Sequence, residues 1–132
     1  MTILEAVGAY LDDNSLGTLG TDLFLAVMPD GPDVMTCVYE TGGGVPDQTM
    51  GPAAWAIDRP SFQILCRAGQ GDYPVARDAA KAIRELLGAV IEQDLSGIHV
   101  MRILPSGGML PMGEDPKGRP LVSINFDAMV LP

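Results

Sequence analysis

The sequence predicts an α+β fold, with an antiparallel or mixed β-sheet of about five strands packed by two helices, and two long loops. The clearest sign is the alternation of apolar and polar residues over 121–131, which is typical of a strand with one buried face. A second alternation covers residues 61–67, and an apolar stripe at helical spacing follows it over residues 72–88. The order helix, strand, strand, strand, helix, strand, strand suits a sheet that carries its helices on one face.

The N-terminal segment predicts a short helix that ends near Asp13 or Asn14. Thr2 and Glu5 have the spacing of a capping box, and an apolar stripe follows, made of Ile3, Leu4, Val7 and Leu11. Gly8 weakens this helix, so we expect it to need a docking surface on its own sheet or on a neighbouring subunit.

Residues 23–28 and 34–40 predict two strands that pair as a hairpin around the turn 29–32, although the two prolines of that turn favour an edge or a loop. The strand over 61–67 directs Phe62, Ile64 and Cys66 to one face. Residues 98–104 and 121–131 complete the set of strands.

The helix over 72–88 has clear boundary signals. Asp72 is suited to the N-cap and Pro74 to the first turn, where its missing N–H costs nothing. Gly88 stands where a left-handed C-cap is expected. The buried stripe is expected to contain Ala76, Ala79, Ala80, Ile83, Leu86, Leu87 and Val90.

Two Gly- and Pro-rich segments, 41–57 and 105–119, are predicted to be long loops or arms within a single domain that spans residues 1–132. The first is either a surface loop or an arm that orders on a neighbouring subunit. In the second case Met50 and Trp55 would serve as apolar anchors, and Met109, Leu110 and Met112 would do so from the second loop.

The bulk properties exclude several classes of protein. A net charge of −9 and a pI near 4.2 argue against a protein that grips phosphate backbones over its surface. Cys37 and Cys66 fall in predicted strands, where buried thiols of a reducing compartment are expected. The sequence contains no signal-peptide pattern and no apolar run of about 20 residues, so we expect a soluble protein made in the cytoplasm and no membrane contact.

No catalytic, cofactor or metal site is expected, and we predict that the protein is not an enzyme. His99 lies within a predicted strand and has no Cys or His neighbour at ligand spacing. No helix opens after the glycines at 42–44, so they do not form a phosphate loop. Arg59 and Arg119 each precede a proline at a strand start. Each is expected either to hold a carboxylate such as Asp58 or Asp115, within the subunit or across an interface, or to be an exposed strand-end charge.

Three stretches resemble the tail terminator and minor capsid proteins of long-tailed bacteriophages, especially those of Gram-positive hosts. They are FLAVMPDGPDVMTCVYETGGGVP, WAIDRPSFQILCRAGQGDYPVARDAAKAIRELLG and PMGEDPKGRPLVSINFDAMV, and they extend from about Phe24 to Val130. None contains a catalytic motif. The resemblance rests on the order and spacing of an Arg-Pro strand, a helix opened by Asp-Tyr, a Gly-Arg-Pro turn and a final strand containing Asn-Phe.

The resemblance implies a virion protein at the head-proximal end of the tail, assembled in the host cytoplasm. Such proteins form hexameric rings that cap the finished tail tube, end its polymerisation and provide the surface on which the head connector docks. The partners implied are other copies of the chain, the tail tube protein and the connector, and DNA passes through the lumen without specific binding. Two alternatives stay open: another head–tail neck or connector protein, and a small α+β ligand-binding module.

Overall fold

The computed structural model describes residues 2–44, 47–48 and 55–131, and it describes side chains outside residues 45–56. Within these residues the elements are α1 (Ile3–Asp13), β1 (Leu23–Leu25), β2 (Met35–Gly43), β3 (Asp47–Gln48), β4 (Trp55–Ile57), β5 (Pro60–Arg67), α2 (Tyr73–Gly88), β6 (Ile91–Leu95), β7 (Ile98–Pro105), β8 (Leu110–Glu114) and β9 (Pro120–Leu131). The predicted α+β class is confirmed.

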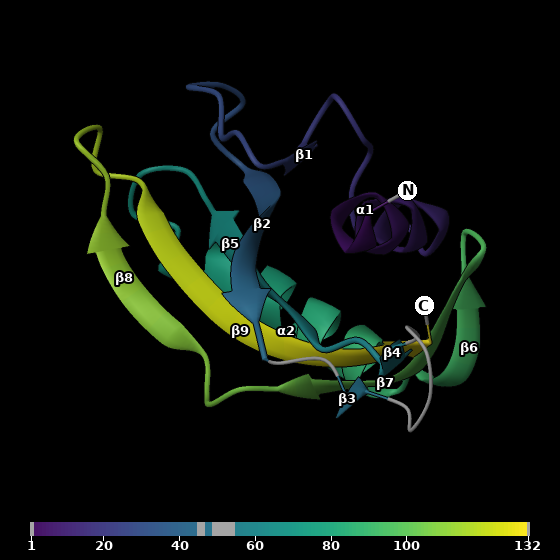
Figure 1. The fold of residues 1–132 in the computed structure, drawn as a ribbon. Helices are drawn as coiled ribbons and strands as arrows, with labels where there is room; N and C mark the ends of the chain where they lie inside the picture. Colours follow the sequence, from purple (N-terminus) through teal and green to yellow (C-terminus); the bar gives the residue numbers. More distant parts are fainter. Residues whose placement is uncertain (1, 45–46, 49–54, 132) are drawn as a thin grey trace.

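A curved sheet of seven strands forms the body of the molecule (Figure 1). Its order is β1-β2-β5-β9-β7-β6, and β8 is added beside β9. The strand β9 is central, because it pairs with β5 along one edge and with β7 and then β8 along the other. The pair β1–β2 is parallel, and the other pairs of this sheet are antiparallel.

One face of the sheet builds the core. Phe62 and Ile64 of β5 lie opposite Phe126 and Ile124 of β9, and all four side chains are fully buried. The rings of Phe62 and Phe126 stack with their centroids 5.3 Å apart. Burying each of these side chains contributes about 1.5–3 kcal/mol, so the alternation that the sequence shows in both strands corresponds to a large packing energy.

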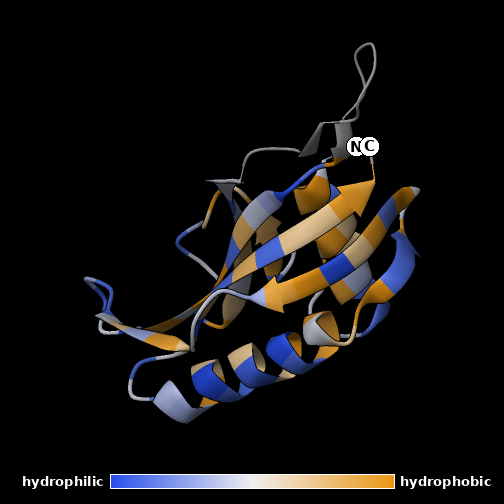
Figure 2. Cartoon of the chain, turned by 60° about the horizontal axis from the view of Figure 1, so that its bottom comes forward, coloured by the Kyte–Doolittle hydropathy of each residue, from blue (hydrophilic) through white to orange (hydrophobic). Residues whose placement is uncertain are grey.

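The two helices cover different strands of the sheet and contribute to one core. The helix α2 packs against β5, β7 and β9, with its hydrophilic side turned away from the sheet (Figure 2). The helix α1 packs against β1, β2 and β6. Because β1 and β6 are the two ends of the strand order, one helix reaches both only through the curl of the sheet (Figure 1).

The start and packing of α1 follow the sequence closely. The Oγ1 atom of Thr2 accepts a hydrogen bond from the backbone N of Glu5 at 3.3 Å, so the predicted N-cap is confirmed. Gly8 lies against β1, and a Cβ atom there would come within 2.8 Å of Leu25 Cδ2. The glycine that lowers helix propensity thus permits the close approach of α1 to its sheet.

The predicted strand count was too low, because the main sheet has seven strands and not about five. The strands that the sequence did not reveal are mostly exposed, as β6 buries only its last residue and β8 buries none. Without a buried face they show no alternation of apolar and polar residues. The segment 105–119 therefore contains β8, which pairs with β9, and the segment 41–57 includes the end of β2 together with β3 and β4.

Two further expectations were wrong. Residues 23–25 and 35–43 do not form a hairpin, since β1 and β2 run parallel and residues 26–34 lead from the end of β1 back to the start of β2. Gly88 is not a left-handed C-cap, because the helix includes it and the cap is Ala89, with φ −88°. Asp72 is the N-cap of α2 as predicted, although its side chain makes no capping hydrogen bond.

Candidate functional site

The connection from β1 to β2, residues 26–34 and here called the anchored loop, is held by a buried arginine. Arg67 is only 4% exposed and lies at the end of β5. Its Nε donates to the carbonyl of Asp33 at 3.1 Å, and its Nη2 lies within 2.8–3.1 Å of the carbonyls of Pro29, Asp30 and Pro32. Burial, and after it the charge of Arg119, lower the pKa of Arg67. A guanidinium is charged in proteins at all ordinary pH values, and Nη2 has two hydrogens for three carbonyls, so one hydrogen is shared between two acceptors.

A second arginine connects the anchored loop to the turn before β9. Arg119 is 5% exposed, and its Nε donates to Asp115 Oδ2 at 2.7 Å. Its two Nη atoms reach Asp33 Oδ1 at 3.2 Å and Asp30 Oδ1 at 3.1 Å, and Lys117 also pairs with Asp30. The sequence left open whether Arg119 holds Asp115 within the subunit, and the structure shows that it does.

This cluster balances three cations, Arg67, Lys117 and Arg119, with three carboxylates, Asp30, Asp33 and Asp115. The hydrogen bond and charge of Lys117 lower the pKa of Asp30. Burial acts to raise the pKa of Asp115, but hydrogen bonds from the backbone and side chain of Arg119 outweigh it and lower that pKa. Asp30 and Asp115 therefore stay ionised and keep the loop attached.

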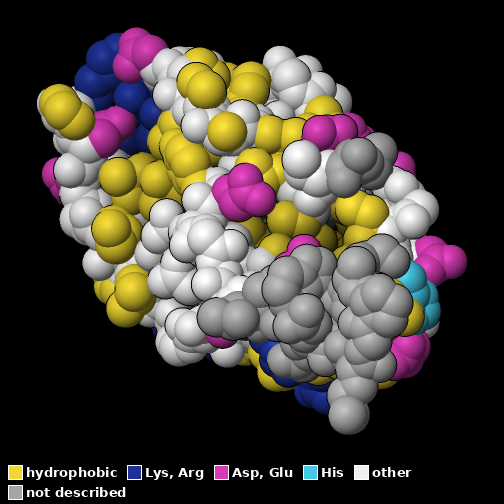
Figure 3. All heavy atoms as spheres, viewed as in Figure 1, with side chains coloured by type: hydrophobic (Ala, Val, Ile, Leu, Met, Phe, Trp, Pro, Cys, Tyr) yellow, Lys and Arg dark blue, Asp and Glu magenta, His cyan; other side chains and the backbone are white. Residues whose placement is uncertain are grey.

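The exposed hairpin, defined as residues 110–119 (β8 and the turn that leads into β9), extends beyond the body of the molecule (Figure 1). All five residues of β8 are exposed, including Leu110 at 49% and Met112 at 52%. In Figure 3, hydrophobic side chains gather along the side of the molecule that β8 forms. Isolated exposed leucines are ordinary, but apolar side chains repeated on an edge strand mark a surface suited to another protein.

The other residues proposed from sequence as contacts occupy different places. Met109 is half-buried and packs on the core, at the start of the exposed hairpin. Arg59 lies near the opposite end of β9, with its Nη1 3.5 Å from Met129 Sδ. Met50 is outside the described residues, and so is the side chain of Trp55. The structure thus brings together Met109, Leu110, Met112 and Arg119 and separates Arg59 from them.

Sequence reasoning did not identify Arg67 as an anchor. Its place in the alternation of β5 directs it away from the core face, which ordinarily indicates an exposed side chain. The sequence offered one sign of such an anchor, the two prolines at 29 and 32. They prevent regular backbone pairing in this connection, so its carbonyls need hydrogen-bond donors from elsewhere.

A separate charged group lies on the hairpin of β6 and β7. His99 Nε2 is 2.7 Å from Glu92 Oε2, and His99 Nδ1 is 2.8 Å from Asp94 Oδ1. The hydrogen bonds of Glu92 and then Asp94 raise the pKa of His99. Among the described residues, no group of His, Cys, Asp and Glu side chains is placed to hold a metal ion, and no helix is long and apolar enough to cross a membrane.

Comparison with known proteins decides which kind of protein carries these surfaces. Residues 10–131 match the family described as bacteriophage tail terminator protein. The chain belongs to this family. Membership makes it a structural protein of a phage virion tail and confirms the resemblance found in its sequence.

Solved structures share the fold of this chain. One, described as the virion of a native gene transfer agent particle, is 20% identical, covers 100% of this chain and 87% of its own, and superposes with a TM-score of 0.59. Another is 14% identical, covers 97% and 89% of the two chains, and has a TM-score of 0.62. No curated protein sequence matches the chain.

Proposed function

We propose that copies of this chain form a hexameric ring that caps the completed tail tube, ends its polymerisation and provides the docking surface for the head connector. The observation that carries the proposal is the family match over residues 10–131. The mechanism is surface complementarity, and no bond chemistry takes part in it.

The exposed hairpin supports an assembly role. Its strand β8 leaves one edge without a partner in the described part of the chain, and its apolar side chains face solvent in the isolated subunit. We therefore assign subunit or tail contacts to Leu110 and Met112 and a supporting position to the half-buried Met109. Arg119 fixes the turn of the hairpin through Asp115. Met50, Trp55 and Arg59 are also proposed as contacts, and of these Arg59 lies at the other end of β9.

The net charge of −9 supports passage of DNA without retention. A lumen walled by an acidic protein repels phosphates, so DNA moves through it without binding. On this proposal, the purified protein should bind duplex DNA weakly even at low salt, where electrostatic attraction is strongest.

The direct test is tube growth. Tail tube protein polymerised with this protein should form tubes of limited length with a ring at one end in negative stain, and tubes grown without it should be longer and uncapped. Light scattering of the protein alone, at several concentrations, reports whether the ring forms before it meets the tube. Tubes that grow equally long with and without the protein, with bare ends in both samples, would reject the proposal.

A further inference from the structure

Two apolar features lie at opposite ends of β9. The exposed hairpin stands at its start, with Leu110 and Met112 directed into solvent. A pocket of about 390 Å³ lies at its end, where Leu131 meets the first residues of α1 and the turn between β6 and β7. Eleven residue steps separate Pro120 from Leu131, which is up to about 36 Å along the strand. One copy therefore cannot insert its own hairpin into its own pocket.

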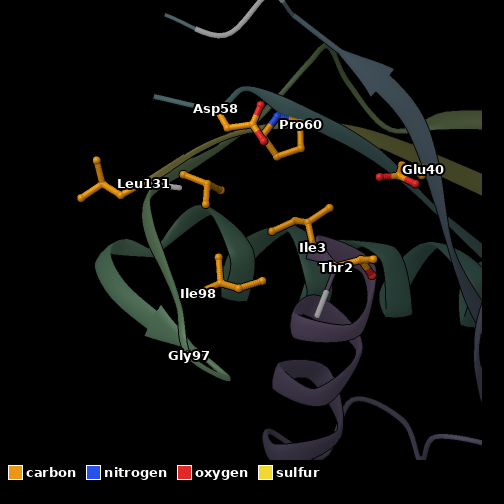
Figure 4. Close-up of a pocket in the computed structure, with 9 residues that line it drawn as sticks. Thr2, Ile3, Glu40, Asp58, Pro60, Gly97, Ile98 and Leu131 are labelled. Carbon is orange, nitrogen blue, oxygen red and sulfur yellow. The ribbon is translucent and has the colours of Figure 1, made fainter. Parts of the chain in front are cut away.

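The pocket has apolar walls and an acidic rim. Figure 4 shows Ile3 and Ile98 facing Pro60 across it, with Leu131 at the side. Glu40 and Asp58 add their carboxylates to the lining. Its volume is within the range of about 300–1,000 Å³ in which pockets hold small ligands, so it has room for large apolar side chains.

The edge of β8 is poorly suited to pairing with another strand. Pro111 has no N–H to donate, and the register with β9 shifts between Pro111 and Glu114, where Gly113 has φ +75°. Prolines and bulges are the devices that protect edge strands from adding a further strand. A partner must then recognise the side chains of Leu110 and Met112 and not the backbone.

The charges of the hairpin permit a second copy to be that partner. Residues 110–119 contain two acidic and two basic residues, Glu114, Asp115, Lys117 and Arg119, within a chain of net charge −9. Because Lys117 and Arg119 balance the carboxylates around them and leave Glu114 over, the hairpin meets less repulsion from an acidic neighbour than other parts of the surface would. An apolar projection and an apolar pocket on one chain supply the two different surfaces that a head-to-tail ring requires.

We propose that the exposed hairpin of each copy docks into the pocket at the end of β9 of the next copy, with Met112 and Leu110 entering between Ile3, Ile98 and Leu131. This inference rests on the proposed ring and specifies the contact that closes it. Each pocket is complete only when a neighbour fills it, and the repeated contact links the copies in one direction around the ring.

The test is a disulfide between copies. A Met112→Cys, Leu131→Cys double variant should form a ladder of cross-linked species on oxidation, because only docking brings the two positions within the roughly 7 Å between Cα atoms that a disulfide allows. The matched control is Met112→Cys, Val75→Cys, since Val75 is 45% exposed on α2 and lies outside both surfaces. Both native cysteines are buried, and burial raises the pKa of Cys66 to about 12, so they do not compete.

A second measurement does not depend on cysteine chemistry. Met112→Asp should weaken association between copies at least about tenfold by light scattering, because a carboxylate would enter an apolar pocket beside other carboxylates. Val75→Asp should change it less than about twofold. If the protein is a monomer in solution, both measurements are made on rings formed at tube ends.

The possible outcomes distinguish a failure of the proposed docking contact from a failure of the proposed ring. Rings that cross-link through residues 112 and 131, and not through 112 and 75, support docking. Rings that form normally but cross-link through neither pair, or through both equally, reject the docking and leave the ring intact. If no ring is found either in solution or on tubes, the proposed function itself fails.

Discussion

The anchored loop and the exposed hairpin are built from similar residues and both lie at the surface, but their backbones are held in different ways. Both are short segments that contain glycine and proline, 26–34 and 110–119. The first is held through its carbonyls by Arg67, which is 4% exposed. The second has a strand in which all residues are exposed. Composition indicates that each segment contains a turn, but hydrogen-bond donors from other parts of the chain decide how firmly its backbone is held.

The two segments differ in which of their groups are bound within the subunit. The anchored loop satisfies its carbonyls with buried donors and so presents a fixed surface. The exposed hairpin is fixed by the pairing of β8 with β9 and at its turn by Arg119 and Asp115, and the side chains of Leu110 and Met112 stay exposed. Stability and assembly can thus be changed by different residues, and each of the following experiments tests that division.

The largest effect on folding should come from Arg67→Met. The change keeps the apolar stem but leaves the carbonyls of Pro29, Asp30, Pro32 and Asp33 without this donor. Each buried group left unpaired costs about 1–3 kcal/mol, and solvent can reach some of them, so the free energy of unfolding should fall by about 3 kcal/mol. Urea denaturation measures the change.

The matched control is Arg102→Met on β7, where the side chain is exposed. It should alter the free energy of unfolding by less than about 0.5 kcal/mol. A loss below about 1 kcal/mol for Arg67→Met would show that the four hydrogen bonds do not hold the loop.

Sequence reasoning succeeded where a residue pattern has one physical cause. The alternation in residues 61–67 and 121–131 and the stripe of α2 arise from one buried face, and these elements were predicted correctly. It failed for β8, whose five exposed residues include Pro111 and Gly113. That strand exists because β9 extends past β7 and offers it an edge, which is a relation between distant segments that no local pattern encodes.

Only part of the candidate site could be predicted from the sequence. The sequence singles out Leu110 and Met112 as candidate contacts, because apolar residues in a Gly- and Pro-rich segment are not explained by a core, and the structure shows both side chains exposed. Arg67 could not be predicted, because its role depends on four carbonyls more than 30 positions away in the chain. The pocket at the end of β9 could not be predicted from the sequence either, because residues of five separate elements line it.

Acid should loosen the attachment between the two regions. The pKa values of Asp30 and Asp115 are lowered below the usual 3.8 in the folded chain. Their contribution to stability is therefore complete above about pH 4 and is lost as the pH falls through the lowered values. Asp115→Asn should lower stability at pH 7 and reduce the further loss between pH 4 and pH 2, as measured by urea denaturation at each pH.

The control for this acid effect is Asp78→Asn on the solvent side of α2. Its loss of stability between pH 4 and pH 2 should equal that of the unsubstituted protein. An Asp115→Asn variant with the same acid loss as both would contradict a role for the Arg119 cluster in attaching the loop.

The β6–β7 hairpin should respond to pH in the opposite direction. A neutral imidazole has one N–H, so His99 donates to both Glu92 and Asp94 only as the imidazolium. Because the folded pKa is raised above 6.5, this contribution is complete below about pH 6.5 and is lost as the pH rises through the raised value. His99→Gln should remove that alkaline loss, and NMR titration of His99 should give a pKa above 6.5. A titration midpoint at or below 6.5 would contradict the paired arrangement.

The smallest effect on folding should come from Met112→Ser. Met109, only three positions away, provides a comparison between an exposed and a half-buried methionine. Met112 is 52% exposed, so removing its side chain should change the free energy of unfolding by less than about 0.5 kcal/mol. Met109 packs on the core, so Met109→Ser should cost about 1–2 kcal/mol through lost apolar burial. Association between copies should show the reverse order, with Met112→Ser weakening it more than Met109→Ser. If Met112→Ser destabilises the subunit as much as Met109→Ser does, the exposed hairpin belongs to the folded body, and its apolar side chains are not reserved for a neighbour.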